Sequence, residues 1–335
     1  MKKIINKPEN FVDETMKGIL AAYGDKVKFY NNDCRILLSN YPAKDGKVGI
    51  VTGGGSGHLP LFLGYVGDGM LDGCTVGNVF ASPAYTKMAD MIRACDRGAG
   101  VLCLYGNYGG DKLNFNQAIE DVEFDDIRCT TVLGADDVAS APYEERSKRR
   151  GVAGIVYAFK IAGAAAKRMM DLDQVTEIAQ KVCDNVRTMG VALTPCIVPE
   201  VGKATFSVAE DEIEIGMGIH GEKGIEVRKM MTADEVAEEL MDKILADMPL
   251  AQGDEVSVMV NGLGGTPMEE QLIVYGKVHD ILAERGVSVF MPHIGEYATS
   301  MEMAGLSVSV LKLDSQLKEL LADPADTPFY TNHNK

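Results

Sequence analysis

Two histidines lie in glycine-rich segments, where a small molecule can reach their rings. His220 stands inside G-M-G-I-H-G-E-K-G at 216–224, and His58 ends the run G-G-G-S-G-H at 53–58. Glycine has no Cβ, so a ligand can approach the backbone closely at such turns. An imidazole can act as a base, or as a nucleophile toward a carbonyl carbon. The two segments therefore predict small-molecule chemistry.

The first glycine run allows two interpretations. It has neither the Gly-Lys-Ser/Thr ending of a phosphate-binding loop nor the third glycine of a dinucleotide-binding fingerprint. In a structural interpretation it is a tight strand-to-helix turn capped by Ser56. In a functional one, the amides of Gly55, Ser56 and Gly57 lie against a ligand, and His58 projects as a hydrogen-bonding or basic group.

A third candidate, Asp111, lies in Y-G-N-Y-G-G-D-K-L-N at 105–114, between a predicted strand and a predicted helix. As the N-cap of that helix it would be structural. As a carboxylate at the end of a strand it could accept a proton from a substrate hydroxyl. Ligands of open α/β sheets gather at the carboxyl ends of strands. His58 and Asp111 both follow such ends, which favours a binding site.

A metal site and a turn without function are the alternatives for His220. Glu222 is the only plausible metal ligand within four residues of it, so we expect no bound metal. His293 ends a predicted strand and either lines a pocket or caps that strand. His279 and His333 attract no functional interpretation.

The apolar pattern predicts strands alternating with helices, which is typical of α/β layering. Thr266 is expected to cap a helix that starts at Pro267, and 141–150 is expected to be an exposed loop. The predicted helices are 8–23, 81–95, 113–120, 152–170 and 172–189. The predicted strands are 47–52, 101–105, 129–133, 205–208, 212–215, 256–260, 288–291 and 307–313.

Length and composition place the chain among globular proteins of two domains. It has 335 residues, and a proline-containing crossover at 195–202 separates the expected α/β domains, 1–190 with the glycine-rich loop and 191–335 with His220. The formal charge of −16 argues against nucleic acid or an anionic membrane as a partner. No apolar run reaches the length of a membrane span, the N-terminus lacks a signal sequence, and the seven cysteines are scattered. We therefore expect a cytoplasmic protein.

Taken together, these segments resemble the K subunit of the bacterial dihydroxyacetone kinases, the DhaK family. The resemblance covers nearly the whole chain. It rests on six ordered motifs: G-G-G-S-G-H at 53–58, G-D-G-M-L-D-G at 67–73, G-N-V-F-A-S-P at 77–83, N-Y-G-G-D-K-L-N-F at 107–115, G-M-G-I-H-G-E at 216–222 and N-G-L-G-G-T at 261–266.

The resemblance implies a DhaK-type fold of two α/β domains, with mixed sheets flanked by helices, and a homodimer. It implies that His220 binds the carbonyl carbon of dihydroxyacetone, or of a related short ketose, covalently as a hemiaminal. Residues Gly55, Ser56, Gly57 and His58 match the loop that contacts the substrate hydroxyls. Asp111 matches the acidic residue beside the reacting hydroxyl, where it and His58 would take the proton.

The resemblance also implies a partner protein. In this family the K subunit binds no nucleotide and no metal, and ATP or ADP with magnesium is held by a separate L subunit. Where the L subunit keeps its ADP, a phosphocarrier of the phosphotransferase system recharges it. The sequence does not choose between these phosphate donors.

Two substrate-site positions depart from the family pattern. Leu59 stands where a glutamate is common, and Gly106 where a lysine is common. Losing the lysine removes a hydrogen-bond donor and opens space for a longer ketose such as erythrulose. A non-catalytic paralogue that senses dihydroxyacetone for a transcriptional regulator is the alternative, and a plain sugar-binding protein is a third. Retaining the two histidines and Asp111 together favours the kinase.

Overall fold

The computed structural model describes residues 2–333, which divide by their internal contacts into two compact units. The first comprises the chain up to Gly134, Val156–Val182 and the chain from Glu319 onward. The second comprises Ala135–Ile155 and Cys183–Lys318. Within the described residues, no helix is both long and apolar enough to cross a membrane.

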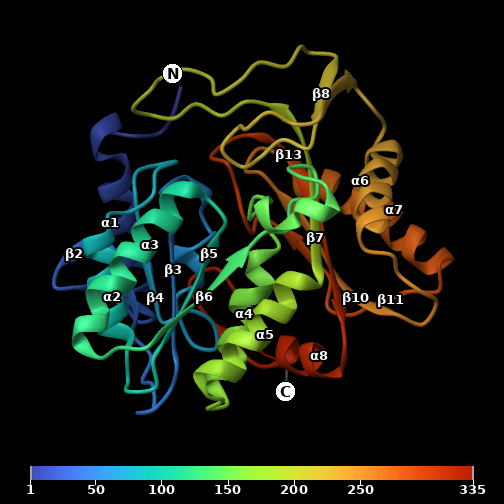
Figure 1. Ribbon diagram of the computed structural model, residues 1–335. Helices are drawn as coiled ribbons and strands as arrows, with labels where there is room; N and C mark the ends of the chain where they lie inside the picture. Colours follow the sequence, from blue (N-terminus) through green and yellow to red (C-terminus); the bar gives the residue numbers. More distant parts are fainter. Residues whose placement is uncertain (1, 334–335) are drawn as a thin grey trace. The chain divides into compact units, whose positions relative to one another are not determined.

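A six-stranded mixed sheet forms the centre of the first unit (Figure 1). Four of its strands are parallel, and β1 and β2 add an antiparallel edge. The spatial order is β1 (Val27–Tyr30), β2 (Asp33–Ser39), β4 (Gly73–Val76), β3 (Gly49–Gly54), β5 (Val101–Gly106) and β6 (Cys129–Gly134). Strands β3, β4 and β5 are buried along their whole length, which explains their continuous apolar sequences.

Helices cover this sheet. Helices α2 (Tyr85–Cys95) and α3 (Gly109–Val122) pack against one another on it (Figure 1), and their apolar side chains share a core with Val51 of β3 and with alternate residues of β5. The unit also contains α1 (Phe11–Tyr23), α4 (Ile155–Lys167), α5 (Leu172–Asp184) and the hairpin of β14 (Ala325–Asp326) and β15 (Thr331–Asn332). Helix α8 (Ser315–Ala322) leads into this last segment.

The second unit is built on a seven-stranded mixed sheet. Its order is β11 (Ser288–Val289), β10 (Glu255–Gly262), β13 (Ala304–Leu313), β7 (Val186–Thr194), β8 (Glu212–Ile215) and β9 (Glu226–Lys229), with β12 (His293–Gly295) also paired to β10. Helices α6 (Ala233–Asp247) and α7 (Met268–Glu284) share its core. The predicted class, α/β with mixed sheets flanked by helices, is confirmed.

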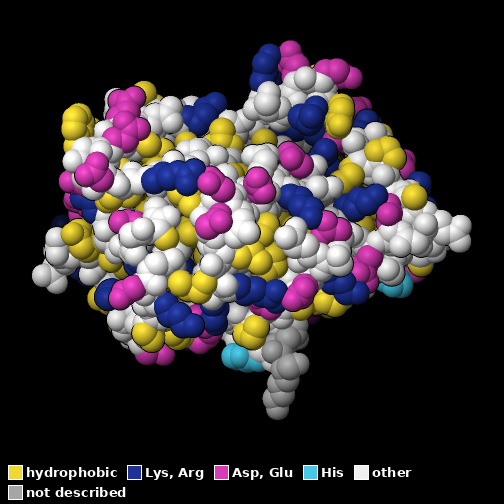
Figure 2. All heavy atoms as spheres, turned by 60° about the horizontal axis from the view of Figure 1, so that its bottom comes forward, with side chains coloured by type: hydrophobic (Ala, Val, Ile, Leu, Met, Phe, Trp, Pro, Cys, Tyr) yellow, Lys and Arg dark blue, Asp and Glu magenta, His cyan; other side chains and the backbone are white. Residues whose placement is uncertain are grey.

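Charges of both signs are interspersed on the molecular face shown in Figure 2. Ion pairs between exposed or half-buried side chains include Lys167 with Asp68 and Arg168 with Asp323.

Two predicted elements are wrong. The helix expected over 172–189 ends at Asp184, and β7 begins two residues later at Val186. The apolar run there pairs with β13 and is buried on both faces, a pattern that periodicity does not distinguish from a helix. The strand expected over 205–208 is absent, since these residues form no regular element.

The predicted helix cap at Thr266 is also wrong. The N-cap of α7 is Pro267. The Thr266 hydroxyl instead donates to the Gly305 carbonyl at 2.7 Å and accepts from the Gly305 amide at 2.8 Å, which ties the turn to β13.

The segment 141–150 is not wholly exposed, because Arg149 is among the most buried side chains of the chain. Its guanidinium makes two hydrogen bonds to the carboxylate of Asp247, and Arg187 binds the same carboxylate. A buried charge needs such a partner. The charged sequence at 141–150 gave no sign that Arg149 would be buried against the distant Asp247.

Candidate active-site residues

Three of the sequence motifs meet at one edge of the first sheet. The loops after β4, β3 and β5 contain motifs 77–83, 53–58 and 107–115, and these three strands are adjacent and parallel. Their carboxyl ends therefore lie at the same edge, where α/β sheets bind ligands. A Cβ on Gly110 would stand 2.7 Å from the Ser82 hydroxyl, which brings the loops of β4 and β5 into contact.

Backbone packing explains the glycines of the 53–58 loop. A Cβ on Gly55 would overlap the carbonyl of Val79, and one on Gly57 would stand 2.8 Å from the same oxygen. The amides of Ser56 and Gly57 donate to Asn78 and Val79 at 3.2 and 2.8 Å. These two amides are thus occupied within the protein, and the loop of β4 is what approaches the glycines.

The hydroxyl of Ser56 does not cap a helix. Residues Ser56–His58 form a short 3-10 helix whose N-cap is Gly55, with no side-chain cap bond. The Ser56 side chain is buried, and its oxygen has no hydrogen-bond partner among the described residues. A buried polar atom of this kind costs free energy unless something satisfies it. A polyhydroxylated ligand would supply that hydrogen bond.

The imidazole of His58 is fully buried in an aromatic setting. It stacks on Phe80 with ring centroids 5.0 Å apart and meets Phe62 edge-on at 6.3 Å. These contacts fix the ring plane, and Phe80 belongs to the loop of β4. His58 is therefore rigidly positioned at the carboxyl edge of the sheet.

The carboxyl group of Asp111 is buried in the first turn of α3. The N-cap of this helix is Tyr108, which excludes the alternative interpretation of Asp111 as the cap. The positive end of the helix dipole stabilises the ionised form of a carboxyl in this turn. Gly106, which stands where the family commonly has a lysine, is the last residue of β5 and lies two residues before Tyr108.

In the second unit, His220 is held by Glu222 through two hydrogen bonds. The backbone amide of His220 donates to Oε2 of Glu222 at 2.9 Å, and the ring Nδ1 lies 2.9 Å from Oε1. The two side chains remain 23% and 33% exposed, so solutes can reach them.

This pairing selects the reactive nitrogen of His220. A carboxylate only accepts hydrogen bonds, so Nδ1 carries the proton in the Glu222 pair. The neutral ring then has its lone pair on Nε2. Nε2 is thus the atom that can attack a carbonyl carbon.

The charge of Glu222 is maintained by this arrangement. Burial acts to raise its pKa, but the hydrogen bonds from His220, together with the charge of that ring when it is protonated, outweigh burial and lower the pKa to about 2. Glu222 is therefore ionised throughout the neutral pH range.

Arg150 stabilises the turn that contains His220. It donates to the carbonyl of Gly216 at 3.0 Å, pairs with Asp137 at 2.7 Å, and lies 4.0 Å from Glu222. A Cβ on Gly218 would overlap the ends of both the Glu222 and the Arg150 side chains, which would have to move away from the turn. The glycines around His220 therefore let a carboxylate and a guanidinium approach the turn.

The sequence reasoning missed Glu222 as an orienting group, and missed Arg150 and Asp137 altogether. The only local signal was an acidic residue two positions after the histidine. The described residues contain no group of three or more side chains suited to hold a metal ion. Of the other histidines, His293 is buried against Tyr297, and His279 is exposed on α7.

Two of the motifs serve packing. In 67–73, a Cβ on Gly67 would stand 2.5 Å from the carbonyl of Asp326, and one on Gly69 would stand 2.5 Å from that of Pro324. The motif thus holds the C-terminal segment of the chain. In 261–266, the amides of Leu263 and Gly265 donate to β13 and to the residue before it, which anchors this turn inside the second unit.

Comparison with known proteins agrees with these motifs. The Dak1 domain model matches residues 17–329. A dihydroxyacetone-binding subunit DhaK of a PTS-dependent dihydroxyacetone kinase from Listeria innocua is 44% identical, over 98% of this chain and 99% of its own. An L-erythrulose kinase from Pectobacterium atrosepticum is 40% identical over 98% of this chain, which spans 56% of that longer protein.

A solved structure extends the comparison to the fold. The dihydroxyacetone kinase operon co-activator Dha-DhaQ superposes with a TM-score of 0.89 at 32% identity. The match covers 96% of this chain and 98% of the co-activator. Kinases and a co-activator thus share this architecture, so fold alone does not separate the two functions.

Proposed function

This chain belongs to the Dak1 domain family, and we propose that it is the substrate-binding subunit of a kinase for dihydroxyacetone or a related short ketose. The observation that carries the proposal is the Glu222–His220 pair, which leaves Nε2 of a reachable imidazole as the nucleophile. The near-complete overlap with a dihydroxyacetone-binding subunit supports the assignment.

The proposed binding step is a reversible addition to the ketone. The lone pair of His220 Nε2 forms a bond to the carbonyl carbon as the C=O π bond breaks. The carbonyl oxygen takes a proton from solvent, and Nδ1 keeps its proton in the hydrogen bond to Glu222, so the hemiaminal carries an imidazolium charge that the Glu222 carboxylate balances. Glycerol, which has no carbonyl, is rejected, and the ketose is held in one orientation for transfer.

Asp111 and His58 are proposed to take the proton from the terminal hydroxyl as it attacks phosphorus. Both are buried at the carboxyl edge of the first sheet, and the Ser56 hydroxyl offers a hydrogen bond to the sugar. That these residues and His220 act on one substrate molecule remains a prediction. The phosphoryl group would come from ATP on a partner L subunit, either exchanged from solution or regenerated there from bound ADP, and magnesium on that subunit would neutralise the developing charge.

The covalent step can be tested with dihydroxyacetone carrying ¹³C at its carbonyl carbon. In the parent, ¹³C NMR is expected to show a protein-bound tetrahedral carbon in place of the ketone. His220→Ala should lose this signal, and His279→Ala, altered at an exposed histidine of α7, should keep it. Full retention of the bound tetrahedral carbon in His220→Ala would refute the covalent anchor.

Phosphoryl transfer is tested separately, by adding an L subunit and Mg-ATP and measuring ketose phosphate. Asp111→Asn should keep the adduct and lose about 10²- to 10⁴-fold in transfer rate, the usual contribution of a general base. Asp126→Asn, at an exposed position, is the matched control. Equal rates in both variants would remove Asp111 from the proposed role.

We also propose a preferred substrate to test, an oligomeric state and an alternative phosphate donor. Gly106 stands at the end of β5 in place of the lysine common in the family, and the erythrulose kinase relative makes erythrulose the first ketose to compare with dihydroxyacetone. A homodimer is proposed, to be measured by sedimentation. Replacing ATP by a phosphorylated phosphocarrier of the phosphotransferase system tests the alternative donor.

A second candidate function is a dihydroxyacetone-sensing co-activator of transcription. The likeness to the co-activator Dha-DhaQ and the departures at Leu59 and Gly106 favour it. A sensor needs the His220 adduct but no transfer. An adduct that forms normally while no ketose phosphate appears with either donor would select this function over the kinase.

A further inference from the structure

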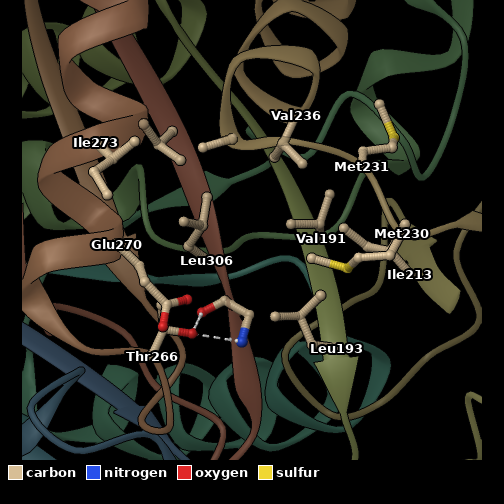
Figure 3. Close-up of a pocket in the computed structure, with 13 residues that line it drawn as sticks. Val191, Leu193, Ile213, Met230, Met231, Val236, Thr266, Glu270, Ile273 and Leu306 are labelled. Atoms are coloured by element: carbon tan, nitrogen blue, oxygen red, sulfur yellow. Dashed lines mark hydrogen bonds between the residues drawn. The ribbon is translucent and has the colours of Figure 1, made fainter. Parts of the chain in front are cut away.

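A pocket of about 110 Å³ lies in the second unit, between the sheet and the first turns of α6 and α7 (Figure 3). Three adjacent strands line it through Ile213, Val191 and Leu306. Met230 and Met231, which join β9 to α6, line another side. Thioether side chains adapt to the shape of an incoming group, so this lining can accept aliphatic side chains of more than one form.

The polar groups of the pocket determine which kind of ligand it would bind best. The Thr266 hydroxyl is engaged by the backbone of Gly305, as the dashed lines of Figure 3 show. The exposed carboxylate of Glu270 lies beside it at the rim (Figure 3). An apolar group entering this pocket would therefore be favoured if it carried a positive charge next to it.

The apolar surface continues outside the pocket. Ile273 and Met230, which line it, are 57% and 54% exposed. Exposed apolar side chains at a pocket mark a contact surface for another protein. A small molecule filling the pocket would leave these side chains uncovered.

The two helices that frame the pocket are strongly acidic. Together α6 and α7 carry ten acidic and two basic residues, a net charge of −8, which is half of the −16 of the whole chain. The Asp247 side chain is only 9% exposed and pairs with two arginines, but eight of the ten acidic residues are exposed along helices of 15 and 17 residues, well beyond the pocket. Such a surface attracts a basic protein segment.

We propose that the pocket and the surrounding faces of α6 and α7 are the docking site for a basic segment of a partner protein. The segment would insert a leucine or similar aliphatic side chain between Leu306 and the two methionines, and place a flanking lysine or arginine beside Glu270. The proposal is independent of the chemistry at His220, so either can fail alone.

The test uses the full chain labelled at its methionine methyl groups and a synthetic nonapeptide, Gly-Gly-Lys-Lys-Leu-Lys-Lys-Gly-Gly. The methyl NMR signals of Met230 and Met231, assigned with Met→Leu variants, are expected to shift saturably, and more weakly as salt is added. The signal of Met169, an exposed methionine of the other unit, should not move. Absence of a saturable shift at millimolar peptide would overturn the proposal.

Matched variants separate pocket binding from general charge attraction. Glu270→Gln is expected to weaken binding about two- to fivefold, the usual range for an exposed ion pair, and Glu269→Gln, which does not line the pocket, should have less effect. Ala233→Leu fills the pocket and should abolish binding; if it unfolds, Ile273→Ser replaces it. Equal binding of a peptide with serine for leucine, or glutamate for lysine, contradicts the proposal.

Discussion

Replacing Glu222 by glutamine tests the orientation of His220 most directly. The carboxylate accepts two hydrogen bonds at 2.9 Å, one from the His220 amide and one from its Nδ1. Glutamine has one oxygen and one NH₂ group, so it can accept only one of them in the same pose. If the glutamine oxygen still accepts the hydrogen bond from the His220 amide, its NH₂ group faces Nδ1, which then becomes the acceptor. The proton moves to Nε2, and the lone pair needed for addition is lost.

The size of the effect follows from the bond that is lost. A hydrogen bond to a charged group contributes about 1.5–3 kcal/mol. Because each 1.36 kcal/mol is a tenfold change in an equilibrium constant, the adduct should form about 10- to 150-fold less favourably in Glu222→Gln. The backbone of the turn should be little changed, since Arg150 still holds Gly216.

The assay measures the equilibrium constant of the adduct by ¹³C NMR with labelled dihydroxyacetone. In parallel, ¹⁵N NMR of the histidine ring reports which nitrogen carries the proton, a quantity that a merely structural role would not change. Glu210→Gln, at an exposed glutamate, is the control. An unchanged adduct constant with the lone pair still on Nε2 would show that the reasoning is wrong.

Three further outcomes are expected. In Gly218→Ala the new methyl overlaps Glu222, so the adduct constant should fall at least about tenfold in the same NMR assay. In Arg149→Ala the loss of a buried charge partner should lower the free energy of unfolding in urea by about 3–5 kcal/mol, whereas the exposed neighbour in Lys148→Ala should change it by less than about 0.5 kcal/mol. Burial lowers the pKa of Lys160 to about 8, from an ordinary 10.5. Above pH 10.5 the Lys160 amine is uncharged in both the folded and the unfolded chain. As the pH falls from 10.5 to 8, the unfolded chain binds the proton more readily than the folded one, so folding stability is lost over this range. The advantage of Lys160→Met in urea unfolding should therefore grow by about 3 kcal/mol between pH 10.5 and pH 8.

Half of the strands of the first sheet could be predicted from local pattern. Strands β3, β5 and β6 are short apolar runs bounded by glycine, and each was expected within two residues of its observed bounds. Strands β1, β2, β4 and β9 were missed, because short runs that mix polar and apolar residues give a weak periodic signal. The strand β7 was mistaken for helix, because only its partners β13 and β8 decide between the two.

The sequence by itself determined which residues are available for chemistry: His58, Asp111 and His220 stand in glycine-rich turns after strands, since glycine patterns are local. Tertiary structure decided how they are held. The proton on His220 depends on a carboxylate folded back onto it, and Arg150, 70 positions earlier, supports that turn. Contacts between residues distant in sequence arise only when sheets and helices pack, so no local pattern records them.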